Sequence, residues 1–251
     1  MAKEAKEGDA PMKLFGNTPD AFFDGAVKSY PWPVKLLDCI ATWAVWGWSK
    51  LYWHWTCDGP DPWHKGAATG QVFVANHSSM LDPALLMAIA NSKGCVLRPL
   101  YKGEFNSSRF VTWFFSRVGA IPIKRGTADM KAIRRAVNAL KRGENVLVFP
   151  EGTRVWDPHA RPELYGGFAM IAQMAGVDVV PVAIDGTELI NPEKRHVLSR
   201  PARVYVRYGE PVGLASVAGE NRKEKAANLE VAAMGRVYEM REALRREHNK
   251  S

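Results

Sequence analysis

The feature that most constrains the fold is an alternation of short apolar runs with longer, helix-like segments, which begins after Gly66. The apolar runs fall at residues 71–75, 96–102, 120–124, 145–149, 177–184 and 203–208. Segments with helical character lie at residues 83–91, 107–118, 128–141 and 166–175, and a charge-rich one follows at 220–250. Strands separated by helix-length segments favour parallel pairing, because a parallel connection needs a crossover of that length. The sequence therefore predicts an α/β fold with a central, mostly parallel sheet flanked by helices.

The segment before this alternation differs in composition, since residues 15–66 hold seven of the nine tryptophans. These are Trp32, Trp43, Trp46, Trp48, Trp53, Trp55 and Trp63. Residues 34–53 are predicted to be a helix that is apolar around most of its circumference but interrupted by Lys35, Asp38 and Lys50. Tryptophan favours the membrane–water interface, because its ring is apolar and its N–H needs a polar partner. We expect a Trp-rich helix in the interface plane, with a core or oligomer-interface helix as the alternative.

The overall charge narrows the kinds of partner. The chain carries a formal charge of +8 and a pI near 9.4, which favours an anionic partner such as nucleic acid, acidic lipid or a phosphorylated small molecule. Nucleic acid is not expected, because the basic residues are not clustered with stacking aromatics. Three dispersed cysteines indicate neither a disulfide framework nor a zinc site, and fit a reducing compartment. No run is apolar enough to span a bilayer, and residues 1–9 lack a signal-peptide core.

A candidate site follows the first apolar run, where His77 and Asp82 lie at an expected strand-to-helix turn. Open α/β sheets bind ligands at such turns, and a carboxylate can orient a histidine that acts as a base. The alternative is structural: Asp82 before Pro83 has the pattern of a helix N-cap, and His77 would then be an ordinary turn residue.

Cations follow other predicted strands at the same edge. Lys102, Arg125 and Arg154 each end or closely follow an apolar run, which would place an anion site beside His77. Gly152 allows a ligand to approach the backbone closely. The alternative is that these are solvated surface residues, with Glu151 and Arg154 as an exposed ion pair.

Several other kinds of site are disfavoured. The chain has no G-x-S-x-G nucleophile elbow, no phosphate-binding P-loop and no dinucleotide fingerprint. A serine nucleophile beside His77 is a minor alternative, because sequence neighbours rarely have the geometry to activate each other. No metal is expected, since His77 and Asp82 have no further ligands at a helpful spacing.

Four motifs stand in a familiar order: Asn-His-x-x-x-x-Asp at 76–82, Gly-Ala-Ile-Pro-Ile-Lys-Arg at 119–125, Phe-Pro-Glu-Gly-Thr-Arg at 149–154 and Val-Val-Pro-Val-Ala-Ile at 179–184. Together they resemble the motifs of the glycerolipid acyltransferase family, whose members include the 1-acyl-sn-glycerol-3-phosphate acyltransferases. The resemblance covers roughly residues 65–215. The family often has a lysine just before the glycine corresponding to Gly167, where this chain has Gly166.

The resemblance implies transfer of a fatty acyl group from acyl-CoA or acyl carrier protein to the hydroxyl of lysophosphatidic acid, giving phosphatidic acid. It implies that His77 is the general base and that Asp82 orients it. The residues implied to hold the phosphate and glycerol portion are Lys102, Arg125, Glu151, Gly152, Thr153 and Arg154. No cofactor is implied beyond the acyl donor, which is a co-substrate.

The same resemblance implies a monotopic protein at the cytoplasmic face of the cell membrane, with the bilayer as a partner. Residues 1–14 would be a flexible leader, 15–66 a helical membrane-anchoring motif, and 67–251 the catalytic domain with the C-terminal helix. Another acceptor remains an alternative, such as glycerol 3-phosphate, another lysophospholipid or a lipid-linked polyol. A non-catalytic lipid-binding module is a further alternative.

Overall fold

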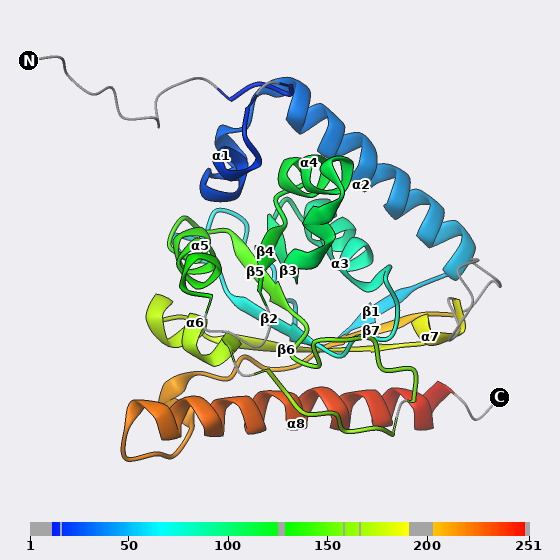
Figure 1. Cartoon of the computed structure of the whole chain (residues 1–251). Coiled ribbons are helices and arrows are strands. Elements are labelled where there is room, and N and C mark those ends of the chain that lie inside the picture. The colour runs from blue at the N-terminus through cyan, green and yellow to red at the C-terminus, as the bar shows by residue number, and fades with distance from the viewer. Residues whose placement is uncertain are drawn as a thin grey trace, which may run out of the picture.

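The computed structural model describes residues 12–15, 17–124, 129–157, 159–165, 167–190 and 203–248. A central sheet lies between two layers of helices, and the long C-terminal helix runs along one side of the molecule while the N-terminal helices lie on the opposite side (Figure 1). This three-layer arrangement confirms the α/β fold that the sequence predicts.

The sheet has seven strands in the order β1-β7-β6-β2-β5-β3-β4. Their bounds are β1 Thr56–Asp58, β2 Val72–Ala75, β3 Leu97–Lys102, β4 Ile121–Ile123, β5 Asn145–Val148, β6 Val179–Asp185 and β7 Tyr205–Tyr208. All neighbours pair in parallel except β6 and β7, which are antiparallel. The carboxyl ends of β2, β5 and β3 therefore meet side by side at one edge of the sheet.

The α-helices are α1 Pro19–Asp24, α2 Trp32–Trp53, α3 Asp82–Ser92, α4 Arg109–Arg117, α5 Met130–Leu140, α6 Gly167–Ala175, α7 Thr187–Ile190 and α8 Arg222–His248. Three 3₁₀ turns accompany them in the described chain: Val27–Ser29, Gly103–Ser107 and Leu214–Ser216. Each predicted run and helical segment corresponds to one of these elements. The strand β1 and the short helices α1 and α7 are additions that the sequence pattern did not indicate.

Alternate side chains of each buried strand pack into two separate cores. In β2, Val72 and Val74 join a cluster with the apolar faces of α5, α6 and α8. Phe73 and Ala75 point to the other face, where they join a cluster with α3 and the end of α2. Because successive side chains of a strand face opposite sides of the sheet, a strand covered on both sides reads as a continuous apolar run. That is the pattern from which the strands were predicted.

The N-terminal helices are held to the sheet by a buried arginine. Arg98 of β3 is fully buried and forms an ion pair of 3.2 Å with Glu144, which is also buried. It also donates to the carbonyl oxygens of Phe22, Phe23 and Gly25. A buried charge needs such a complete set of partners. These contacts fix the position of α1, and so the start of α2, relative to the sheet.

Helix α2 presents one face to the protein and another to solvent. Val34 and Trp53 are buried, and Asn91 of α3 donates to Thr42 at 2.8 Å. The exposed apolar residues of α2 are Trp32, Leu36, Ile40, Trp43, Trp48 and Leu51. Most of them recur at three- or four-residue steps, so they form a stripe along one side of the helix, called here the apolar stripe of α2. Within the described ranges, no helix combines the length and the apolar content that crossing a bilayer requires.

Candidate functional site

The candidate site is built on the turn between β2 and α3, residues 76–82. Asn76, directly after β2, is fully buried, and its amide exchanges two hydrogen bonds of 2.8 Å with the backbone of Ile184 in β6. These two hydrogen bonds take the place of a backbone–backbone pair between neighbouring strands and fix the direction in which the chain leaves β2. His77 then emerges at the carboxyl edge of the sheet, with 16% of its side chain exposed.

His77 and Asp82 are in contact, as the sequence predicts. The Nδ1 atom of His77 lies 3.0 Å from Oδ2 of Asp82, which is fully buried. Because an ionised carboxylate only accepts, Nδ1 carries a proton, and in the neutral form of the ring Nε2 has the free lone pair. The ring of Phe149 stacks on the imidazole at a centroid distance of 4.3 Å and limits its rotation. The contact with Asp82 therefore favours, for the neutral imidazole, the tautomer that can accept a proton through Nε2.

The N-cap interpretation of Asp82 is wrong. Asp82 is the first residue of α3, and the N-cap position belongs to Leu81. Instead, Oδ2 of Asp82 accepts backbone N–H groups from Ser78 and Ser79, each at 2.8 Å. The carboxylate thus closes the turn behind His77 while it orients the ring. A carboxylate can accept several bonds at once, so these two roles are compatible.

Glu151 is the second acid of the site, and it is buried rather than exposed as the solvated-pair alternative supposes. Its Oε2 accepts the backbone N–H of His77 at 2.7 Å, and its Oε1 accepts the hydroxyl of Tyr238 at 3.2 Å. The loop after β5 is also tied to the turn by Val155, whose N–H donates to the His77 carbonyl at 2.7 Å. The motifs at 76–82 and 149–154 therefore form one hydrogen-bonded unit.

Gly152 is required at its position by the backbone and by a neighbour. Its φ is +67°, which favours glycine, and a Cβ there would lie 2.4 Å from the ring of Tyr165. Thr153 next to it is exposed. The guanidinium of Arg154 lies 5.0 Å from the ring centre of Trp156, within the range of a cation–π contact. The tight turn at Gly152 thus sets where Thr153 and Arg154 leave the loop.

Two of the three predicted cationic residues, Lys102 and Arg154, lie within the described residues. Lys102 ends β3, at the same edge as His77, and pairs with Glu104 at 2.5 Å. Arg154 follows β5, which is the strand between β2 and β3. Arg125 lies outside the described residues, as does Gly166, so the expectations for both stay predictions.

Two residues of α8 touch this site and were not predicted from the sequence. Besides Tyr238, the buried Arg241 donates to the hydroxyl of Ser78 at 2.9 Å. Ser78 is itself fully buried, so its hydroxyl is engaged within the protein and is unsuited to be a nucleophile. No local pattern marks these contacts, because 87 residues separate Glu151 from Tyr238 and 163 separate Ser78 from Arg241.

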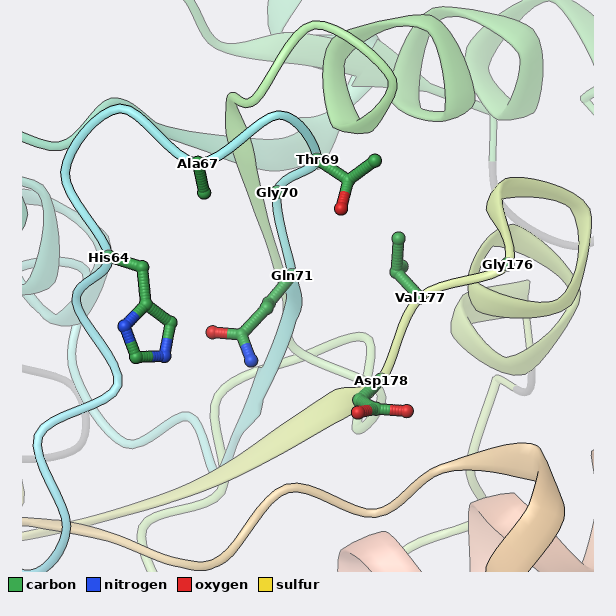
Figure 2. Close-up of a pocket in the computed structure, with 8 residues that line it drawn as sticks. All are labelled: His64, Ala67, Thr69, Gly70, Gln71, Gly176, Val177 and Asp178. Carbon is green, nitrogen blue, oxygen red and sulfur yellow. The ribbon is translucent and has the colours of Figure 1, made fainter.

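A separate pocket lies at the opposite edge of the sheet, where β2 and β6 begin (Figure 2). It is about 310 Å³ in volume and is lined by His64, Ala67, Thr69, Gly70, Gln71, Gly176, Val177 and Asp178. Its position away from the His77 turn gives it no part in the chemistry argued here. Among the described residues, no group of three or more His, Cys, Asp or Glu side chains is arranged to hold a metal ion.

Comparison with known proteins identifies the family of the chain. Residues 55–185 match the family model described as Acyltransferase. The chain is 30% identical over 174 residues to the chloroplastic 1-acyl-sn-glycerol-3-phosphate acyltransferase of Brassica napus, covering 63% of this chain and 46% of that protein. It is 38% identical over 114 residues to the lyso-ornithine lipid O-acyltransferase of Pseudomonas aeruginosa, covering 45% of this chain and 42% of that protein.

One solved structure is similar to this chain over most of its length. The crystal structure of the 1-acyl-sn-glycerophosphate acyltransferase from Thermotoga maritima matches with a TM-score of 0.61 and 26% identity, covering 85% of this chain and 80% of that one. The chain spans about half the length of three of the curated 1-acyl-sn-glycerol-3-phosphate acyltransferases that it matches. Since the family model matches residues 55–185, more than half of the 251-residue chain, this protein belongs to the acyltransferase family.

Proposed function

We propose that this acyltransferase moves a fatty acyl group from the thioester of acyl-CoA or acyl carrier protein to the hydroxyl of lysophosphatidic acid, giving phosphatidic acid. The observation that carries the proposal is the contact of 3.0 Å between His77 Nδ1 and the buried Asp82, which leaves Nε2 able to accept a proton at the sheet's carboxyl edge. A non-catalytic lipid-binding protein has no need of this arrangement.

In the proposed reaction, Nε2 of His77 removes the proton of the acceptor hydroxyl as its oxygen attacks the thioester carbonyl. Asp82 stabilises the imidazolium that forms, as a triad aspartate does. The tetrahedral intermediate then collapses and the carbon–sulfur bond breaks. The sulfur takes the proton that His77 had accepted and leaves as a free thiol. The acyl group passes directly between substrates, so no acyl-enzyme is needed.

The acceptor phosphate is proposed to lie beside this base. Lys102 ends β3 and Arg154 follows the neighbouring strand β5, and Thr153 adds an exposed hydroxyl. Arg125 is proposed to join them on the motif resemblance alone. Arginine and lysine at one sheet edge favour a phosphate, which arginine can bind through two parallel hydrogen bonds. Gly152 lets the backbone approach the glycerol, and Glu151 keeps the two motifs together.

An acceptor panel tests the proposal. Purified protein is given acyl-CoA or acyl carrier protein thioester together with lysophosphatidic acid, glycerol 3-phosphate, a lysophospholipid with a larger headgroup, or a lyso-ornithine lipid. Lysophosphatidic acid is expected to be acylated with the highest kcat/KM, because it joins a phosphate monoester, which suits the cationic edge, to an acyl chain, which glycerol 3-phosphate lacks. Absence of product with every acceptor would contradict the proposed function.

A second candidate keeps the chemistry and changes the acceptor. It is favoured by the Pseudomonas aeruginosa relative, whose name gives a lyso-ornithine lipid as its acceptor. The variant Arg154→Gln separates the two. It is expected to raise the KM for a phosphorylated acceptor by about tenfold, as loss of a charge-assisted hydrogen bond does, and to leave that for a lyso-ornithine lipid nearly unchanged. An equal effect on both acceptors would remove the phosphate role of Arg154.

The protein is further proposed to work at the cytoplasmic face of the cell membrane, bound through the apolar stripe of α2. Trp32, Trp43 and Leu51 are 75%, 54% and 77% exposed, which is unusual for side chains of this size grouped on one helix. Tryptophan suits the interface, and the exposed Lys35 can meet acidic headgroups. Since both the acceptor and the product are lipids, an interfacial position brings the site to its substrate.

Vesicle sedimentation tests this placement. The double variant Trp43→Ser/Leu51→Ser is expected to bind vesicles of acidic phospholipid at least about tenfold more weakly, because it removes two large apolar contacts with the bilayer. Val231→Ser is the matched control, since Val231 is 72% exposed on α8, on the other side of the molecule (Figure 1). Equal binding by the wild type and the double variant would contradict the proposed role of the stripe.

A further inference from the structure

The helix α8 lies outside the residues that match the acyltransferase family model, which end at residue 185. It packs along β6 and against β2, and its buried apolar residues explain most of that packing. Yet two of its polar residues, Tyr238 and Arg241, are directed at the turn that carries His77. They are one helical step of three residues apart and so lie on the same side of α8.

Tyr238 is linked to His77 through the carboxylate of Glu151. Its hydroxyl donates to Oε1 of Glu151 at 3.2 Å, and Oε2 of the same carboxylate accepts the His77 backbone N–H at 2.7 Å. Burial raises the pKa of Glu151 above its ordinary value, while the His77 N–H, Arg241 and the Tyr238 hydroxyl all favour its ionised form. An ionised carboxylate accepts stronger hydrogen bonds than a neutral one, so Tyr238 and Arg241 strengthen the hold of Glu151 on His77.

Arg241 reaches the other side of the same turn. It is 2% exposed, and its Nη2 donates to the Ser78 hydroxyl at 2.9 Å. The same guanidinium lies 3.5 Å from Oε2 of Glu188 and 3.8 Å from Oδ1 of Asp185, so two acids hold it in place. Ser78 in turn donates its backbone N–H to Asp82. Tyr238 thus acts, through Glu151, on the backbone of His77, and Arg241 acts, through Ser78, on the turn that Asp82 closes.

We propose that Tyr238 and Arg241 are positioning residues, which brace the His77–Asp82 turn from the C-terminal helix and hold Nε2 of His77 where the acceptor hydroxyl binds. Neither residue touches the reacting atoms; each acts through Glu151 or Ser78. The inference rests on the proposed function, because it assumes that His77 is the base. Catalytic rates respond to misplacement of a base by fractions of an ångström, so loss of the brace should affect kcat more than substrate binding.

The structure supplies a matched control one turn further along α8. Arg245 binds the same two acids as Arg241, with Nη1 at 2.9 Å from Oδ1 of Asp185 and 2.8 Å from Oε1 of Glu188. Arg245 donates to these two acids, whereas the bond to Ser78 comes from Arg241. If Arg241 served only to attach α8 to the domain, Arg245→Met and Arg241→Met would have similar effects.

The experiment compares Tyr238→Phe, Arg241→Met and Arg245→Met with the wild type. Tyr238→Phe keeps the ring, which also lies 4.3 Å from the Arg161 guanidinium, and removes only the hydroxyl. We expect Tyr238→Phe and Arg241→Met each to lower kcat about tenfold, with the KM of both substrates changed less than about twofold. In these two variants, amide hydrogen exchange of residues 76–82 should speed up about tenfold. Arg245→Met should leave kcat and this exchange near the wild-type values.

A double-mutant cycle sharpens the test for Arg241. Ser78→Ala removes the hydroxyl that Arg241 holds, so Ser78→Ala/Arg241→Met should lose no more activity than the larger of the two single losses. Additive losses would overturn the link through Ser78. If the wild type is active and the Tyr238, Arg241 and Arg245 variants all have the same kcat, the positioning role of Tyr238 and Arg241 is overturned, while the proposed function stands. A folded wild type that acylates no acceptor would instead overturn the proposed function and, with it, the catalytic meaning of the brace.

Discussion

Replacement of His77 by alanine is expected to lower kcat/KM for acyl transfer by about 10²–10⁴-fold, the range that a positioned general base contributes. The side chain is 16% exposed at the carboxyl edge, and its Nδ1 is bound to Asp82, so only Nε2 is directed to accept a proton. Alanine removes that acceptor, and the hydroxyl must then attack the thioester while it still holds its proton. The backbone N–H that binds Glu151 remains in the variant, so the fold of the turn should be preserved.

The measurement is the initial rate of thiol release in the presence of lysophosphatidic acid. His64→Ala is the control, because His64 is an exposed histidine that lines the pocket at the opposite edge of the sheet (Figure 2). His64→Ala is expected to keep the wild-type rate. A His77→Ala variant with near-normal kcat/KM would remove His77 as the base.

The second large effect is expected for Asp82→Asn, at about 10²-fold or more in kcat. The Oδ2 atom of Asp82 faces the His77 Nδ1 and the N–H groups of Ser78 and Ser79, so the oxygen of asparagine is expected to take the same place. The tautomer of His77 is then retained. What is lost is the negative charge that stabilises the imidazolium during the reaction. That loss is large because Asp82 is fully buried, where water cannot replace the charge.

Asp82→Ala is the comparison that separates charge from structure. It leaves the N–H groups of Ser78 and Ser79 without their acceptor, at a cost of about 1–3 kcal/mol in the free energy of unfolding for each group that stays buried. Asp82→Asn should keep a melting temperature closer to that of the wild type than Asp82→Ala does. If Asp82→Asn were as active as the wild type, the carboxylate would have only the turn-closing role.

Much of the fold could be predicted because the parallel strands are covered on both faces. The strand β2 alternates between the two cores, and it is apolar throughout for that reason. The carboxyl edge could be predicted in the same way, since His77, Lys102 and Glu151 each come at or just after the end of such a strand. The strand β1, Thr56–Asp58, could not, because it is short, exposed and without apolar periodicity. It exists because it pairs with β7.

Within the site, the contact between His77 and Asp82 could be predicted from the sequence, but the other contacts of the turn could not. The N-cap interpretation of Asp82 rests on a local preference of Asp-Pro that the fold does not follow, since Leu81 is the N-cap residue. The side chain of Asp82 turns back to Ser78 and Ser79, which a helix propensity does not reveal. Tyr238 and Arg241 reach the turn only because α8 crosses the sheet beside β6 and β2. Such contacts depend on the packing of distant elements and leave no motif in the sequence.

The most direct measurement follows the products of the wild-type protein and of His77→Ala side by side. Each is mixed with acyl-CoA or acyl carrier protein thioester and lysophosphatidic acid in vesicles, and the lipids and free thiol are quantified by mass spectrometry. The proposed function predicts phosphatidic acid and free thiol in equal amounts from the wild type, and a loss of both from His77→Ala. Thiol release without any acylated acceptor, or equal product from the two proteins, would contradict it.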